Sequence, residues 1–456
     1  MPVELIEHRP KNSRPIQLVT SAGFNGMALS PAARAWAEAN GFSGEAGRLL
    51  LVPNPEGGIE EALFGVGNGQ EGALAAGSLA KSLPEGDWHF AAAPEDASLA
   101  TLGLVLGGYS FTRYGKKPGK SIRFTLPKGA DAGSIGRIAE SVFLARDLIN
   151  TPTNDMGPAA LEDAARKLAK AHKARVSVTV GDKLLEANFP MIHAVGRAST
   201  EAPRLIDFSW GRKAAPKVTL VGKGVCFDTG GLDIKPASGM LLMKKDMGGA
   251  ANVLGLASMI MAADIDVRLR VLIPAVENAI SGNAFRPGDV LQSRKGLTVE
   301  IGNTDAEGRL ILADALALAD EEAPDLLIDM ATLTGAARVA LGPDLPPFYT
   351  GDDALADEIA KASAEVEDPL WRMPLWKPYE AKLSSKIADI NNVTTDGFAG
   401  SITAALFLQR FVEKAKSWVH FDIFGWSPSD RPHGPTGGEA QAIRALEKVI
   451  AGRYGK

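Results

Sequence analysis

Cysteine is almost absent from this sequence, in which Cys226 is the only example among 456 residues. A single cysteine excludes an intramolecular disulfide and a metal centre built from several cysteines. No apolar run approaches the roughly 20 residues that a membrane-spanning helix requires. The first eight residues also lack the basic start and apolar core of a secretory signal. These absences predict a cytoplasmic protein that does not enter a membrane.

The sequence has only six histidines, and its 49 lysines and arginines are fewer than its 54 aspartates and glutamates. The six histidines show no zinc-ligand spacing such as His-Glu-x-x-His. The formal net charge of -5 argues against nucleic acid as the main partner. A basic cluster at Arg113, Lys116, Lys117 and Lys120 keeps a DNA-binding accessory role open, although a solvated loop is its simpler interpretation. Ser238 and Ser401 have no evident Ser/His/Asp context, so nucleophilic catalysis by the chain itself is unsupported.

The apolar pattern divides the chain into a small and a larger α/β region. We expect an N-terminal α/β domain over residues 1–129, a connecting helix over 130–153 and a C-terminal domain over 154–456. In the larger region, strand-like runs near 176–180, 205–208, 218–221, 269–273 and 326–330 alternate with helical segments. This alternation predicts a mixed central sheet with helices on both faces, whose ligands gather beyond the carboxyl ends of the strands. We expect the chemistry in the loops after residues 221, 273, 301 and 330, so the strand that ends at 301 is expected to belong to this sheet.

A charged stretch, 303–310, lies between a strand-like run at 297–301 and an apolar helical run at 310–319. If extended geometry continues, Asp305, Glu307 and Arg309 project from one face. The alternative is a salt-bridged turn. Charges between two hydrophobic elements are costly to bury unless they are paired or bound to metal, which favours a functional site.

Acidic residues also follow the strand expected at 218–221. Lys223, Asp228 and Lys235 lie among glycines, and Asp246 precedes a helix of small residues. A phosphate-binding loop is an alternative, but the spacing of a Walker A motif is absent. Asp246 alone would be interpreted as a helix cap. Together with Asp305 and Glu307, however, these acids would repel each other unless cations neutralise them, which predicts a two-metal hydrolytic site.

The stretch Asn303-Thr304-Asp305-Ala306-Glu307-Gly308-Arg309-Leu310 resembles the signature of the leucyl aminopeptidase family, which comprises cytosolic two-metal enzymes. Further segments resemble the family in the same order from about residue 145 to the end; they are 222–231, 235–236, 246–251, 277–278, 287–289 and 331–336. The resemblance therefore implies that residues 154–456 form a two-metal peptidase domain.

The resemblance also implies a role for individual residues. The metal ligands would be Lys223, Asp228, Asp246, Asp305 and Glu307. A water shared by two metal ions would attack the peptide carbonyl, Lys235 would stabilise the oxyanion, and Arg309 would hold a bicarbonate that shuttles the proton. The substrate would contact Met243, Thr332, Leu333 and Gly335, although Met243 is equally explained as core packing.

The family resemblance further implies peptide substrates with leucine or another apolar first residue, and assembly as a homohexamer. Two divalent ions are expected, Mn or Zn first, with Mg or Co as alternatives. Asp233 and the segment 189–193 depart from the common pattern and resemble the smaller peptidase-B-like bacterial branch. A metal-binding scaffold without catalysis is the remaining alternative, and the presence of both Lys235 and Arg309 argues against it.

Overall fold

The computed structural model describes residues 3–69, 71–115 and 119–455. Lys116 and Lys117 of the basic cluster lie outside the described residues. The chain forms two compact units, one of residues 1–143 with 428–436 and the other of residues 144–427 with 437–456. The boundary falls within the long helix α4 (Ala132–Asn150), where the sequence predicts a connecting helix. The segment 428–436, which the sequence places in the larger domain, belongs to the first unit.

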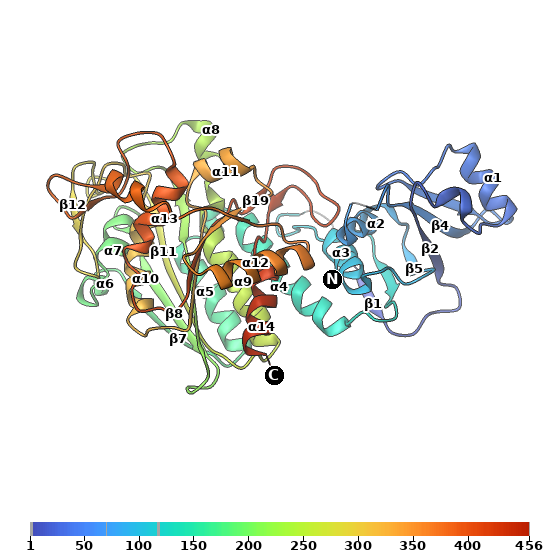
Figure 1. Cartoon of the computed structure of the whole chain (residues 1–456), viewed down its shortest axis with the longest axis horizontal. Coiled ribbons are helices and arrows are strands. Elements are labelled where there is room, and N and C mark those ends of the chain that lie inside the picture. Colours follow the sequence, from blue (N-terminus) through green and yellow to red (C-terminus); the bar gives the residue numbers. More distant parts are fainter. Residues whose placement is uncertain (1–2, 70, 116–118, 456) are drawn as a thin grey trace. The chain divides into compact units, whose positions relative to one another are not determined.

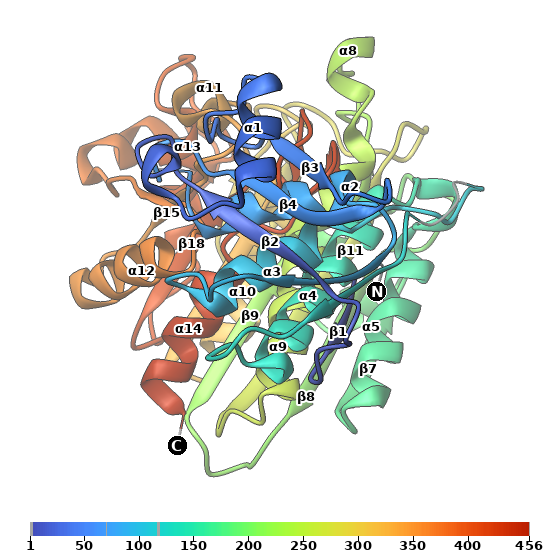
Figure 2. The ribbon, with the colours of Figure 1, turned by 90° about the vertical axis from the view of Figure 1, so that its right-hand side faces the viewer.

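The first unit contains a six-stranded sheet in the order β1-β6-β5-β2-β4-β3. Only β3 is antiparallel to its neighbour. In Figure 2, α1 lies beside this sheet, where it contacts β3. The elements are β1 (Val3–Ile6), β2 (Arg14–Val19), α1 (Pro31–Ala39), β3 (Leu49–Pro53), β4 (Ile59–Gly65), α2 (Leu79–Ser82), β5 (Gly86–Phe90), α3 (Ala97–Gly107) and β6 (Ile122–Thr125).

The second unit is built on a nine-stranded sheet in the order β16-β15-β18-β14-β9-β11-β8-β7, with β10 paired to β11. Its strands are β7 (Arg175–Val180), β8 (Arg204–Trp210), β9 (Lys217–Gly222), β10 (Gly224–Asp228), β11 (Arg268–Asn278), β14 (Leu326–Ala331), β15 (Pro347–Tyr349), β16 (Trp371–Arg372) and β18 (Trp418–Asp422). The central strands β18, β14, β9, β11 and β10 are mutually parallel. Their carboxyl ends therefore meet at one edge.

Helices cover both faces of this sheet (Figure 1). One face carries α7 (Pro190–Gly196), α10 (Gly308–Asp320) and α13 (Gly400–Gln409), and the other carries α5 (Pro158–Ala171), α9 (Gly248–Ala262), α12 (Asp353–Glu365) and α14 (Ile443–Tyr454). The central strands β9 and β14 are apolar almost throughout because both faces of the sheet are buried there, whereas the edge strand β7 alternates and is partly exposed. The predicted α/β fold, with a mixed sheet between helical layers, is confirmed.

Shorter elements complete the second unit. They are α6 (Lys183–Glu186), α8 (Ala237–Met240), the 3-10 helix η4 (Met243–Met247), α11 (Gly335–Leu341), a small sheet of β12 (Val290–Gln292), β13 (Thr298–Glu300) and β17 (Ile390–Asn391), and the pair β19 (Trp426–Ser427) and β20 (Gly437–Gly438). The strand before the charged stretch, β13, thus belongs to a separate sheet, contrary to expectation. Among the described residues, no helix combines the length and apolar character needed to cross a bilayer.

Candidate metal centre and substrate pocket

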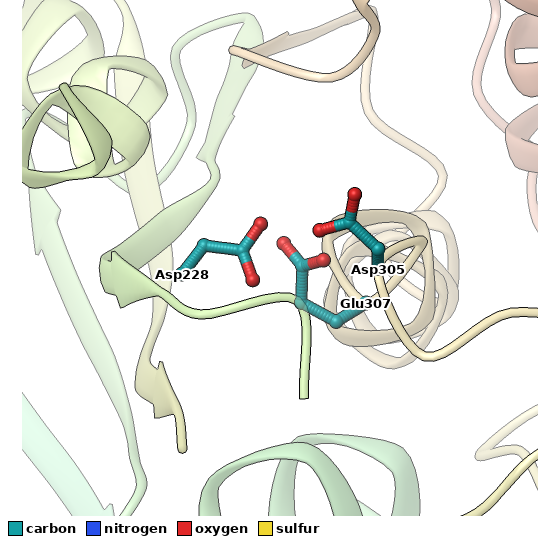
Figure 3. A group of neighbouring side chains, drawn as sticks. All are labelled: Asp228, Asp305 and Glu307. Carbon is teal, nitrogen blue, oxygen red and sulfur yellow. The ribbon is translucent and has the colours of Figure 1, made fainter. Parts of the chain in front are cut away.

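A carboxylate cluster lies at the carboxyl edge of the large sheet. Asp228 ends β10, next to an irregularity in its pairing with β11, whereas Asp305 and Glu307 precede α10. Carboxylate oxygens of these three residues all lie within 4.8 Å of one another. Figure 3 shows the three carboxylates turned toward one another. Such an arrangement of oxygen donors suits a divalent cation.

The backbone conformation that brings Asp305 and Glu307 together is not the expected extended strand. The stretch that contains Asp305 is a turn, and Gly308 begins helix α10, so the alternation of side chains by two does not apply. A buried amide holds this turn in place, because Asn392 accepts hydrogen bonds from the backbone of Gly302 and Asn303. The predicted convergence of Asp305 and Glu307 is therefore correct, but its geometric explanation is wrong.

Two lysines enter the same cluster. Lys223, directly after β9, places its Nζ 2.7 Å from Asp246 and 3.1 Å from Glu307. Lys235 places its Nζ 2.8 Å from Asp228 and also pairs with Asp305. All five predicted metal ligands and Lys235 therefore occupy one site. Asp246 lies in η4 and makes no capping contact to α9, so its interpretation as a helix cap is wrong.

The charge of this cluster is unbalanced, because four carboxylates face two lysines. Burial, together with the neighbouring Asp228, raises the pKa of Glu307 well above its usual range and that of Asp305 to about 6. Burial alone would lower the pKa of Lys223, but Asp246, Glu307 and Asp228 outweigh it and raise that pKa. The residues present thus fit a positively charged group, and Lys223 would have to lose its proton to become a ligand.

Positioning groups that the sequence did not reveal surround the cluster. Asn278, the last residue of β11, donates to Asp228 at 2.8 Å and to the carbonyl of Thr304 at 3.1 Å. Asp233 accepts hydrogen bonds from the backbone and hydroxyl groups of Thr304. These residues join the loop after β10 to the loop before α10. The sequence signal for Asn278 is its position in a segment that resembles the family, whereas Asp233 stands out in the sequence only as a departure from the common pattern.

Arg309 lies in the first turn of α10, two residues after Glu307. Its Nη1 donates to the carbonyl of Asn392 at 2.6 Å, and its buried Nε has no hydrogen-bond partner among the described residues. Burial lowers the pKa of Arg309 to about 10, so the guanidinium remains charged near neutral pH. A charged group with a free donor in a buried site is suited to an anion.

A pocket of about 520 Å³ opens onto the cluster and is of the size that encloses small ligands. It is lined by the predicted substrate residues Met243, Thr332, Leu333 and Gly335. Thr332 donates to Asp246 at 2.9 Å and its carbonyl accepts from Lys223 at 3.0 Å. The predicted substrate residues thus share one cavity with four of the five predicted metal ligands, which are Lys223, Asp228, Asp246 and Asp305.

The loop after β14 is held against the pocket by Asp422, at the end of β18. Its carboxylate accepts hydrogen bonds from the backbone of Leu333 and Thr334, both at 3.0 Å, and from the hydroxyl of Ser401 at 2.8 Å. The pocket also contains Lys245, which the sequence did not single out. Burial lowers the pKa of Lys245 to about 8, so its amine is mainly charged at pH 7.

Comparisons with known proteins find related domains over most of the chain. A model described as the catalytic domain of the cytosol aminopeptidase family matches residues 143–447, and one described as the M17 aminopeptidase N-terminal domain matches residues 15–127. A probable cytosol aminopeptidase of Rhodococcus opacus is 38% identical over 448 residues, which covers 90% of this chain and 86% of the relative.

Two solved structures are similar over nearly the whole chain. The crystal structure of the cytosol aminopeptidase from Coxiella burnetii has a TM-score of 0.94 and 47% identity, and the match covers 99% of both chains. The bottromycin maturation enzyme BotP, in complex with Mn, has a TM-score of 0.87 and 31% identity, with 97% of this chain and 100% of that chain covered. This chain is therefore a peptidase that belongs to the cytosol aminopeptidase family.

Proposed function

We propose that the protein is a metal-dependent aminopeptidase that removes the first residue of peptides in the cytoplasm, leucine and other apolar residues among them. The observation that carries this proposal is the meeting of Asp228, Asp246, Asp305 and Glu307 with Lys223, four of which line the pocket. Bound divalent ions would supply an acidified water and a Lewis acid for the peptide carbonyl. These five residues would hold two ions, with Mn or Zn first and Mg or Co as alternatives.

The chain's own residues supply the remaining functions. Lys235 offers a cationic donor beside Asp228 and Asp305, where it would stabilise the negative charge that develops on the carbonyl oxygen. Arg309 would hold a bicarbonate through donors that the protein leaves free. Arg309 would bind and orient this anion, which would supply a group able to accept a proton, because a guanidinium does not act as a base near neutral pH.

Substrate selection would follow from the pocket walls. Met243 and Leu333 would provide apolar surface for the first side chain, and Thr332 and Gly335 would contact the peptide backbone; all four line the pocket. The complex of the related BotP with Mn supports Mn as the first ion to test. We further propose a homohexamer, whose mass in sedimentation would be six times the chain mass of 47.9 kDa. A monomer would contradict the proposed assembly.

The test is hydrolysis of aminoacyl p-nitroanilides and their amino-acetylated counterparts by metal-stripped protein, with Mn, Zn, Co or Mg added back. Cleavage of the free-amine substrates alone, restored by metal, is the expected result. Glu307→Ala should abolish this turnover in metal-replete buffer, whereas Glu162→Ala, on α5 and outside the pocket, should retain it. Normal turnover by Glu307→Ala would show that the assigned site is wrong.

A further inference from the structure

A buried carboxylate outside the proposed metal centre bonds to the wall of the substrate pocket. Asp422 is the last residue of β18 and is only 2% exposed. Its oxygens accept hydrogen bonds from the backbone N–H groups of Leu333 and Thr334, both at 3.0 Å. They also accept from the hydroxyl of Thr334 at 2.6 Å and from that of Ser401 at 2.8 Å. An ionised carboxylate can only accept, so these four donors suit its charged form.

A chain of two hydroxyl groups supports this carboxylate from two further elements. The hydroxyl of Tyr349 in β15 lies 2.6 Å from that of Ser401 in α13. Ser401 has a single hydroxyl proton and donates it to Asp422, so Tyr349 is the donor to Ser401. Burial, together with the charge of Asp422, raises the pKa of Tyr349, so this donor keeps its proton. The chain therefore runs in one direction and ends at the charge of Asp422.

The loop that Asp422 holds, residues 332–335, is the part of the pocket that would contact the peptide backbone. All four of its residues line the pocket, whereas Asp422 is not part of that lining. The loop is also fixed at its start, where Thr332 donates to Asp246 at 2.9 Å. At its far end, the hydroxyl of Thr334 donates to Asp422 and accepts from the first turn of α11 at 3.1 Å. The conformation of this wall therefore depends on Asp422 from behind.

We propose that Asp422 is a positioning residue for substrate binding, whose charge holds residues 332–335 in the conformation that receives the peptide backbone. This inference rests on the proposed aminopeptidase function. Ser401 and Tyr349 act through Asp422, because they hold and polarise its carboxylate. A hydrogen bond to a charged acceptor is roughly twice as strong as one between neutral groups. Removal of this charge therefore loosens the loop and leaves every side chain of the pocket lining in place.

The test measures kcat and KM separately for hydrolysis of Leu-Gly-Gly by Mn-loaded wild-type protein and Asp422→Asn. Asparagine has nearly the same shape as aspartate, and its oxygen can still accept from the loop, but it carries no charge. We expect KM to rise about tenfold, which corresponds to about 1.4 kcal/mol. The kcat should stay within about threefold, because the lost interaction holds the substrate before and during the reaction alike. Ser401→Ala should raise KM less, and Tyr349→Phe least.

Matched variants separate substrate positioning from a loss of stability. Asp368 is another buried carboxylate that accepts from backbone N–H groups, here at the start of α14 and outside the pocket lining. Asp368→Asn should therefore lower the Tm, as Asp422→Asn does, but leave KM unchanged. Thr403 donates to backbone carbonyls at the start of α13. Thr403→Val removes this buried hydroxyl and is the control for Ser401→Ala.

Hydrogen exchange measures the loop itself, without any substrate. The amides of Leu333 and Thr334 should exchange about tenfold faster in Asp422→Asn, because a local opening free energy lower by about 1.4 kcal/mol has this effect. In Asp368→Asn their exchange should match that of the wild-type protein. Unchanged exchange of both amides in Asp422→Asn would overturn the proposal.

The kinetic outcomes are equally decisive. An unchanged KM in Asp422→Asn, or a fall in kcat without a rise in KM, would overturn the positioning role. If Asp422→Asn does not fold, Ser401→Ala and Tyr349→Phe decide, and an unchanged KM in both would refute the proposal. If the wild-type protein cleaves no peptide, the aminopeptidase function fails. Calorimetric binding of Leu-Gly-Gly to Mn-loaded wild-type protein and Asp422→Asn then decides the positioning role, which equal affinities would refute.

Discussion

At the scale of single residues, the site requires small residues that make room for neighbouring side chains, as well as residues that would bind ligands. Gly308 is the clearest case. A Cβ atom at this position would lie 2.5 Å from Cε and 2.8 Å from Nζ of Lys223. Contacts this short would force the lysine away from Asp246 and Glu307. The glycine of the signature is therefore required by the path of Lys223.

Gly308→Ala should lower kcat/KM by about 100-fold, because displacing a catalytic group by about 1 Å has effects of that size. The fold should persist, since alanine is favourable in a helix. Steady-state kinetics and far-UV circular dichroism measure the two effects. Gly452→Ala in α14 is the matched control, because a Cβ there meets no atom within 4 Å. Full activity in Gly308→Ala would mean that Lys223 tolerates a different path.

Asn392 gives a second prediction, which concerns the turn that carries Asp305. Its buried amide accepts from the backbone of Gly302 and Asn303 and donates to the carbonyl of Asn303. Asn392→Asp keeps the acceptor but loses the donor, which should reduce the unfolding free energy by about 1–3 kcal/mol. Denaturant titration measures this loss. Asn391→Asp, at a partly exposed neighbour, should have a smaller effect; equal effects would refute the explanation.

At the scale of elements, the sequence predicts the strands and helices well but not their partners. Apolar runs identify β9, β11 and β14 because both faces of the sheet are buried. Periodicity contains no information about which sheet a short strand joins, so the expectation that β13 belongs to the central sheet is wrong. The acidic motifs predict the carboxylates of the site. Asn278, Asn392 and Asp422 lie far from those motifs in the sequence, and only tertiary structure brings them to the site.

The pair β14–β18 carries a buried ionisable contact that gives a pH prediction. His420 Nδ1 lies 2.5 Å from Asp329, which also accepts from Trp418 Nε1 at 2.8 Å. Burial alone would lower the pKa of His420, but the Asp329 carboxylate outweighs it and raises that pKa above 6.5. A raised pKa in the folded state means that stability is fully present below the unfolded pKa of about 6.5 and is lost as pH rises through the folded pKa.

We therefore expect the unfolding free energy to fall above pH 6.5, by about 1.4 kcal/mol for each unit by which the folded pKa exceeds the unfolded one. Asp329→Asn removes the charge that raises the pKa, so this part of the pH dependence should disappear. Urea unfolding at several pH values between about 6 and 9, in both proteins, measures the difference. Identical pH profiles would show that the contact does not retain the proton on His420.

At the scale of the whole molecule, the candidate ligands all belong to one of the two compact units. Asp228, Asp246, Asp305, Glu307 and Lys223 lie within residues 144–427. The excess of buried carboxylates raises the pKa of Glu307 and Asp305, which means that this unit holds unfavourable negative charge when no cation is bound. A divalent ion that binds the folded unit should therefore stabilise that unit specifically.

Metal removal by a chelator should thus lower the Tm of one unfolding transition, and added Mn should restore it in proportion to the logarithm of its concentration. The gain would be about 2.7 kcal/mol when Mn exceeds its Kd by 100-fold. Glu307→Gln should show a smaller shift because it removes one of the four carboxylates, and potassium at equal ionic strength should give none. Calorimetry would separate the transition of the second unit, residues 144–427 with 437–456, from that of the first unit. A uniform shift of both transitions, or none in either, would contradict a metal centre confined to the second unit, because a ligand can raise the Tm only of the unit whose folded state binds it.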